Sequence, residues 1–173
     1  MKSISFNDEM VRAILEGRKS QTRRPVKGLQ GYTHISGSQD SERSWKFFSE
    51  DGSYANIDCP YGKVGGLLSV RGTTITLEIT NIRVERVQEI SPEDAIREGA
   101  REFLDLPPSS PYGQDDRWSM GSPTRTGQCL GSPIMAFANA WNSIYEKKGF
   151  GWHVNPWAWV IEFKIAEDSH GKV

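Results

Sequence analysis

The clearest pattern along the chain is a strict alternation of apolar and polar residues near its centre. Ile75, Leu77 and Ile79 alternate with threonine and glutamate. Alternation with a period of two is typical of a strand with one buried face. The pattern therefore predicts a strand whose apolar residues face the core, with Thr76 and Glu78 on the opposite face.

Other apolar runs bounded by turn residues indicate further strands. These are predicted at residues 3–6, 44–48, 67–70 and 157–164. The second of them is expected to form one strand of a hairpin that turns at Asp51 and Gly52, because an Asp-Gly pair is a strong turn signal.

Three segments show helical spacing and start at a capping residue. Asn7 precedes apolar residues at 10, 11, 14 and 15, and Gly17 fits the end of that helix. Ser91 and Ser132 are each followed by proline, which suits the first helical position. Helices are therefore predicted after Asn7, Ser91 and Ser132, with the second ending at Gly99.

Two long segments, about 28–60 and 105–131, are rich in glycine, proline and small polar residues and show no sustained periodicity. We interpret them as insertions with little regular structure. Residues 1–168 are predicted to form a single domain and 169–173 a C-terminal tail. Because strands outnumber crossover helices, the order of elements favours an α+β fold: a small, mostly antiparallel β-barrel flanked by helices.

The charge balance limits the classes of partner. The 173 residues carry 21 Lys and Arg against 22 Asp and Glu, a formal net charge of -1. Such a chain has no overall basic field, so any contact with nucleic acid must be local.

Cysteine usage and hydropathy limit cofactors and location. Cys59 and Cys129 are far apart and lack metal-ligand spacing, so neither a metal, a cofactor nor a disulfide is predicted. The chain starts with a polar segment and contains no run long enough to span a membrane, and we expect a cytoplasmic protein. The oligomeric state is not predicted.

The residues from 17 to 24 are the main candidate for chemistry. Residues 18–24 are almost wholly polar and carry four cations, and Pro25 prevents a helix from continuing, so a loop or short extended turn is predicted there. Lys19 and Thr22 are three residues apart, and a lysine with a lowered pKa can act as base for a nearby hydroxyl. The same residues are also compatible with a solvated basic turn.

Other charged residues are candidates for substrate contact or proton transfer. Arg18, Arg23 and Arg24 could clamp phosphate oxygens or pair with surface acids, and Arg71 is a fourth candidate for binding. Glu78 could orient Lys19 or relay a proton, or it could be an ordinary outward-facing residue of its strand.

Three segments carry a family resemblance. Residues 10–24 (MVRAILEGRKSQTRR) resemble the opening helix and signature of ASCH-domain proteins, which have a PUA-like fold. Residues 77–80 (LEIT) resemble the central strand of that family. Residues 157–163 (WAWVIEF) are similar to the ending of long ASCH proteins of phages and prophages.

The resemblance implies a small β-barrel with a cleft suited to RNA or to modified nucleosides. Some ASCH proteins are amidohydrolases that deacetylate N4-acetylcytidine with a Lys, a Thr and a Glu, which would be Lys19, Thr22 and Glu78 here. Two alternatives are a non-catalytic RNA-binding module or phage regulator, and a metal-independent ribonuclease.

Overall fold

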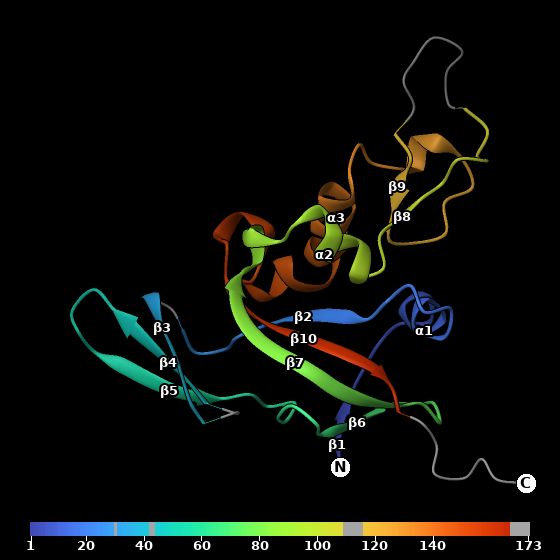
Figure 1. Ribbon diagram of the computed structural model, residues 1–173. Coiled ribbons are helices and arrows are strands. Elements are labelled where there is room, and N and C mark those ends of the chain that lie inside the picture. Colours follow the sequence, from blue (N-terminus) through green and yellow to red (C-terminus); the bar gives the residue numbers. More distant parts are fainter. Residues whose placement is uncertain (30, 42–43, 109–115, 167–173) are drawn as a thin grey trace, which may run out of the picture.

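A five-stranded sheet forms the centre of the molecule. The computed structural model describes residues 1–29, 31–41, 44–108 and 116–166. The strands of this sheet are β1 (Lys2–Ile4), β2 (Gln21–Pro25), β6 (Leu67–Val70), β7 (Thr76–Arg86) and β10 (Trp157–Ile165). Their order is β1-β6-β7-β10-β2, and only the β1–β6 pair is parallel (Figure 1).

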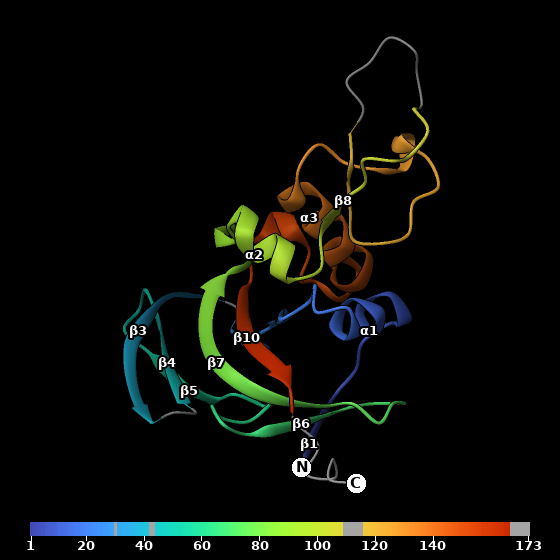
Figure 2. The ribbon, with the colours of Figure 1, turned by 45° about the vertical axis from the view of Figure 1, so that its right-hand side comes forward.

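The predicted central strand is confirmed as β7. Leu77 and Ile79 are fully buried, whereas Thr76 and Glu78 are partly exposed. β7 is the longest strand of the sheet and curves strongly in both ribbon views (Figure 2). The mostly antiparallel α+β class is confirmed, although the main sheet ends at β1 and β2 and does not close into a ring of paired strands within the described residues.

The segment predicted as a loop at residues 18–24 is half strand, and that prediction is corrected here. β2 pairs antiparallel with β10 along the edge of the main sheet. The Ser20 carbonyl accepts from the Phe163 amide, and the Val26 amide donates to the Trp157 carbonyl. Pro25 is tolerated because an edge strand has one side that needs no ladder partner. The polar residues of β2 gave no strand signal in the sequence. Most of them are buried by elements that lie far away along the chain.

A second sheet lies within the segment predicted to lack regular structure. It consists of β3 (Tyr32–Ser41), β4 (Ser44–Ser49) and β5 (Tyr54–Asp58). The predicted hairpin is confirmed, but the expectation of little structure over 28–60 is wrong. Trp45 and Phe47 are buried, and the Trp45 ring meets Trp159 edge-on at a centroid distance of 4.9 Å. This sheet therefore belongs to the main core.

The three predicted helices are confirmed together with their caps. They are α1 (Asp8–Leu15), α2 (Pro92–Arg97) and α3 (Pro133–Tyr145). Asn7, Ser91 and Ser132 each accept a hydrogen bond from a backbone amide in the first turn. Each cap satisfies a donor that has no partner within the helix. No helix in the described ranges is long and apolar enough to cross a membrane.

The second predicted insertion contains little regular structure where it is described. Its regular elements there are β9 (Trp118–Ser119) and the 3-10 turn η2 (Thr126–Gln128), and β9 pairs with β8 (Arg101–Glu102), which precedes the insertion. Three further 3-10 turns connect other elements: η1 (Val87–Glu89), η3 (Glu146–Lys148) and η4 (Trp152–Val154). The predicted tail at 169–173 lies outside the described residues.

Two apolar clusters lie on opposite faces of β10. Trp159 and Ile161 belong to the main core, whereas Ala158 packs in a smaller cluster with Phe137 and Trp141 of α3. α2 and α3 cover this second face (Figure 1). Burial on both faces explains why residues 157–161 read as a continuous apolar run. It also places the polar residues of β2 beneath a helical layer.

Candidate functional site

Lys19 lies at the junction between α1 and β2, and the local backbone turns its side chain inward. Gly17 has a φ of 72°, and the amides of Arg18 and Lys19 both donate to the Ala13 carbonyl. This left-handed turn ends the helix and redirects the chain into the strand. Gly99 faces the lysine, because a Cβ there would lie 3.8 Å from the Lys19 Cβ. The absence of a side chain at Gly99 therefore leaves space for the aliphatic part of the Lys19 side chain.

The Lys19 ammonium is buried and fully bonded. It donates to the Gln21 carbonyl at 2.7 Å, to the Glu98 carbonyl at 2.7 Å and to the Glu98 carboxylate at 3.1 Å. The residue is 2% exposed, and it is the only lysine buried among the described residues. A lysine with all three donors satisfied is held in one position. The Gln21 carbonyl belongs to the peptide bond that leads into Thr22.

The environment of Lys19 favours loss of its proton. Burial lowers the pKa of Lys19 below its ordinary value, the Glu98 carboxylate opposes this effect, and Arg24 adds to it. A buried ammonium loses its hydration, which destabilises the charged form. A lysine with a lowered pKa can act as a base nearer to neutral pH than an exposed lysine.

Thr22 and Glu98 line one small cavity. The cavity has a volume of about 20 Å³ and is bounded by β2 on one side and by Trp141 and Tyr145 of α3 on the other. Thr22 is 1% exposed. The structure therefore joins Lys19 to Glu98 through an ion pair, and Glu98 to Thr22 through the cavity that both residues line.

Glu78 lies apart from this contact. Its carboxylate pairs with the Lys164 ammonium of β10 at 3.1 Å, and its side chain is 37% exposed. In the described residues the carboxylate that contacts Lys19 is that of Glu98. Glu98 was not among the residues singled out from the sequence. Its position before the helix-ending Gly99 was visible there, but a partner 79 residues distant was not.

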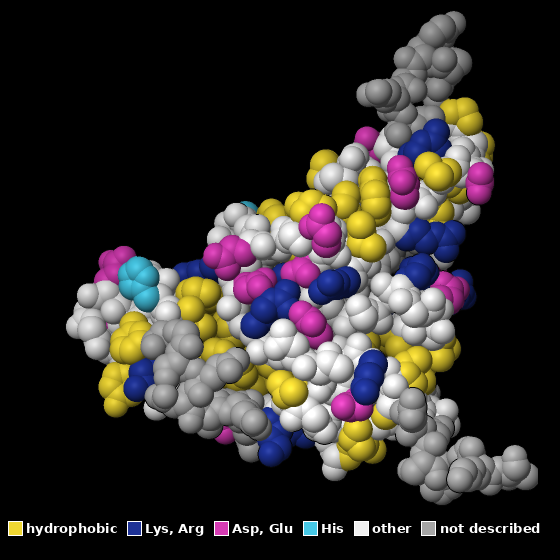
Figure 3. All heavy atoms as spheres, in the orientation of Figure 1, with side chains coloured by type: hydrophobic (Ala, Val, Ile, Leu, Met, Phe, Trp, Pro, Cys, Tyr) yellow, Lys and Arg dark blue, Asp and Glu magenta, His cyan; other side chains and the backbone are white. Residues whose placement is uncertain are grey.

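Arg23 is the centre of a buried charge network. Its guanidinium contacts Glu85 at 2.7 Å, Asp94 at 2.8 Å and Glu98 at 3.4 Å, and its side chain is fully buried. Arg83 extends the network by pairing with Asp94 at 2.6 Å and with Glu85 and Glu162. We call this set, with Lys19, the Lys19 network. Figure 3 shows mixed charged side chains gathered between α2 and strands β7 and β10.

The structure places the other candidate arginines in separate environments. Arg18 pairs with Glu16 at 2.6 Å, and Arg24 donates to the Tyr145 hydroxyl at 3.0 Å and lies over the Phe6 ring. Arg71 donates to the Ser3 hydroxyl at 2.9 Å, on the β1–β6 side of the sheet. The four predicted contact arginines are therefore not gathered on one surface.

A different set of arginines does converge. A hollow of about 190 Å³ is lined by Arg12 of α1, Arg18 of the turn that follows α1 and Arg101 of β8, together with Glu9 and Glu16. Gly99, which packs against Lys19, also lines it. Arg12 and Arg101 were not candidates from sequence, because they are 89 residues apart and each alone is an ordinary surface cation. The described residues contain no cluster of three or more metal-ligating side chains.

Two proteins of known structure align with most of this chain. An ASCH domain from Lactobacillus crispatus JV V101 aligns with a TM-score of 0.46 and 16% identity, over 94% of this chain and 79% of that chain. A DUF984 protein from Enterococcus faecalis V583 aligns with a TM-score of 0.49 and 11% identity, over 100% of this chain and 86% of that chain. The sequence matches no protein-family model and no curated protein.

Proposed function

We propose that the protein is an amidohydrolase that removes the acetyl group from N4-acetylcytidine or a related modified nucleoside. The observation that carries the proposal is the buried Lys19 ammonium, whose pKa is lowered by burial and which holds the peptide bond leading into Thr22. A lysine with a lowered pKa can activate a hydroxyl nucleophile that comes within hydrogen-bonding distance.

The proposed chemistry requires Lys19 to be neutral and to exchange the Gln21 carbonyl for the Thr22 hydroxyl. The amine then accepts the hydroxyl proton while the Thr22 oxygen attacks the acetyl carbonyl carbon. The C–N bond breaks as the Lys19 ammonium returns that proton to the N4 nitrogen, so cytidine leaves. Lys19 then takes a proton from water as the water oxygen attacks the acetyl-threonine ester. The ester C–O bond breaks as the Lys19 ammonium gives that proton to the Thr22 oxygen, which releases acetic acid and restores neutral Lys19 and the Thr22 hydroxyl.

A carboxylate completes this constellation, and two residues compete for the role. The family resemblance assigns it to Glu78, whereas direct contact with Lys19 supports Glu98. We propose Glu98 as the group that orients the lysine. Arg23 is a positioning residue in this scheme, because it contacts Glu98 and is fully buried.

Substrate contact is assigned to the exposed cations nearest this location. Arg18, with Arg12 and Arg101, lines the hollow beside Gly99, and paired guanidinium donors match phosphate or carbonyl oxygens. Arg24 borders the 20 Å³ cavity itself. That volume is close to the space of a single water molecule. Binding of a nucleoside therefore requires the side chains of Met120 and Tyr145, which also line the cavity, to move.

Deacetylation of N4-acetylcytidine by the purified protein, followed as cytidine release, is the direct test. Thr22→Val is expected to lower kcat by at least ~100-fold and Thr22→Ser to retain part of it, since the serine hydroxyl can replace the nucleophile. Turnover that is absent in the wild type, or unchanged in Thr22→Val, overturns the proposal. Circular dichroism of both variants separates loss of chemistry from loss of fold.

A matched pair of variants distinguishes the roles of Glu98 and Glu78. Glu98→Gln is expected to abolish most deacetylation and Glu78→Gln to leave it within ~2-fold, because an exposed ion pair contributes little. The opposite result assigns the role to Glu78, as the family resemblance implies.

A second candidate function is RNA binding without catalysis. The convergence of Arg12, Arg18 and Arg101 on one hollow favours it, as does a Lys19 ammonium whose donors are all satisfied. Salt-sensitive RNA binding that survives Thr22→Val and fails in Arg18→Gln and Arg101→Gln supports this function. Cleavage of the RNA during the same measurement, in the presence of a chelator, indicates a ribonuclease instead.

A further inference from the structure

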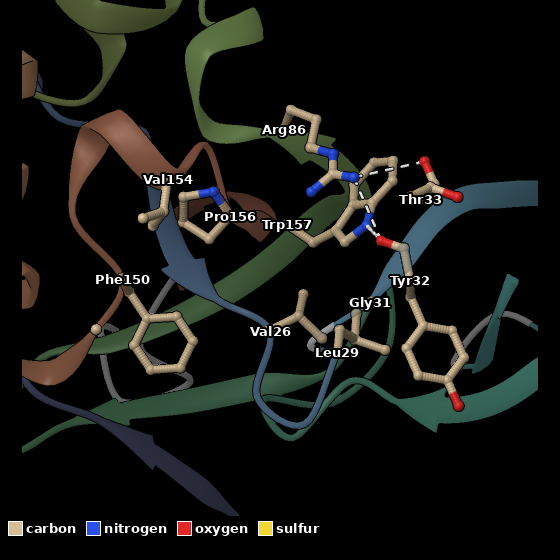
Figure 4. Close-up of a pocket in the computed structure, with 11 residues that line it drawn as sticks. Val26, Leu29, Gly31, Tyr32, Thr33, Arg86, Phe150, Val154, Pro156 and Trp157 are labelled. Carbon is tan, nitrogen blue, oxygen red and sulfur yellow. Dashed lines mark hydrogen bonds between the residues drawn. The ribbon is translucent and has the colours of Figure 1, made fainter. Parts of the chain in front are cut away.

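A separate pocket lies beyond the other end of β2. It has a volume of about 380 Å³ and lies between the segment from β2 to β3 and the segment that leads into β10. Figure 4 shows Phe150, Val154 and Pro156 on one side, Leu29 and Tyr32 on the other, and Arg86 with Trp157 between them. We call it the Arg86 pocket. Its size is that of a small-molecule site.

Arg86 is the cation of this pocket, and it is held by neutral groups. Its guanidinium lies over the Trp157 ring at 4.1 Å and donates to the carbonyls of Tyr32 at 3.3 Å, Thr33 at 3.4 Å and Asn155 at 3.2 Å. The Trp157 indole N–H donates to the same Tyr32 carbonyl at 3.0 Å, which fixes the ring beneath it. The guanidinium is thus held in place before any ligand binds.

The charge of Arg86 is opposed at a distance by the Glu89 carboxylate, which favours the charged guanidinium. No carboxylate of the described residues lies within ion-pair distance of Arg86, in contrast to Arg23 and Arg83 of the Lys19 network. The three hydrogen bonds to carbonyls use Nη1 and Nη2, so the Nε donor and one Nη1 donor remain for another acceptor. Burial lowers the pKa of Arg86, because the half-buried guanidinium loses part of its hydration. A partly desolvated cation favours an anionic partner.

The other walls of the pocket are apolar, and they determine which kind of molecular body fits beside Arg86. Val26 and Leu29 are buried side chains at one wall, and Val154 and Pro156 face them from the opposite segment. A ring or a short hydrocarbon chain placed between these walls would remove apolar surface from water, which favours binding. Within the described residues the pocket has no carboxylate that would repel an anion.

We propose that the Arg86 pocket binds a small organic anion, with one carboxylate or phosphate group on Arg86 and an apolar or planar body against Val26, Leu29 and Val154. The anion either belongs to a free carboxylic acid or to the phosphate of a nucleotide. This site is distinct from the Lys19 network and does not depend on the proposed deacetylation.

Binding to matched charged and neutral probes tests the proposal. Titration calorimetry compares 3-phenylpropanoate with 3-phenylpropanamide, and uridine 5′-monophosphate with uridine. At least one anion is expected to bind with a Kd of ~1 mM or tighter and at least ~10-fold more tightly than its neutral partner. The first pair identifies a free acid and the second a nucleotide. Equal binding of both members in both pairs, or no binding, overturns the proposal.

Two variants locate the binding. Arg86→Gln is expected to remove the preference for the anion, and Arg71→Gln, which alters an arginine outside the pocket, to keep it. Val154 is 50% exposed, so Val154→Trp can fill the pocket with little disturbance of the core and is expected to block binding. An anion preference that survives both Arg86→Gln and Val154→Trp refutes the assignment. Deacetylation is expected to be unchanged in both.

Discussion

The two ends of β2 lead to two regions that handle positive charge in opposite ways. At the beginning, Lys19 and Arg23 are buried and each contacts carboxylates. Beyond the other end, Arg86 is held by backbone carbonyls and an indole ring. The first arrangement neutralises its cations, whereas the second only positions one. We therefore expect the Lys19 network to depend on its ion pairs for stability, whereas the proposed ligand of the Arg86 pocket would supply an anion to Arg86.

The largest expected effect is the loss of Arg23. Arg23→Met is expected to lower the free energy of unfolding by ~3–5 kcal/mol, since it leaves three carboxylates beside an apolar side chain. Urea denaturation followed by circular dichroism measures it. The matched control is Arg71→Met, expected to change stability by less than ~0.5 kcal/mol because Arg71 is exposed. Equal effects of the two variants would show that the ion pairs of Arg23 are unimportant.

The pH dependence of stability is the next test of the Lys19 network. The pKa of Lys19 is lowered in the folded state, so between that pKa and ~10.4 the unfolded chain binds more protons at this site. Stability contributed by this site therefore rises with pH across that window. Urea denaturation of the wild type and of Lys19→Met at several pH values from 8 to 11 isolates the contribution of Lys19 to the free energy of unfolding. A difference between them that does not change with pH contradicts a lowered pKa.

The rate of deacetylation should depend on the same titration. The proposed base is neutral Lys19, so kcat/KM is expected to rise with pH through the lowered pKa of this residue and then level off. A rate that falls over this range, with the fold intact, is incompatible with Lys19 as the base.

A smaller effect on stability is expected at Arg86. Arg86→Gln removes the contact with Trp157 and the hydrogen bonds to carbonyls but leaves no buried carboxylate unpaired. A loss of ~1 kcal/mol is expected from these neutral interactions. Thermal or urea denaturation beside Arg23→Met gives the comparison. A loss as large as that of Arg23→Met would mean that Arg86 is a structural residue.

The smallest expected effect is at Glu78. Its ion pair with Lys164 is exposed, and Glu78→Gln is expected to change the free energy of unfolding by less than ~0.5 kcal/mol. The same denaturation measurement on Glu98→Gln should show a loss of several kcal/mol, because its buried partner Lys19 is left without a carboxylate.

The elements that local chemistry specifies were predictable from the sequence. The caps Asn7, Ser91 and Ser132 satisfy donors within their own first turns, and the alternation from Ile75 to Ile79 reflects one strand with one buried face. Each signal lies within a few residues, so no tertiary information is needed to interpret it. The pair Lys19 and Thr22 was also visible as a local spacing.

Tertiary structure decided what surrounds those residues. β2 is a strand because β10, about 135 residues later, provides its ladder, and Glu98 rather than Glu78 reaches Lys19 because α2 ends above β2. The same packing buries Arg23 among carboxylates and places Arg86 against backbone carbonyls and the Trp157 ring. Burial and charge pairing depend on segments far apart in sequence, which no local pattern of residues records.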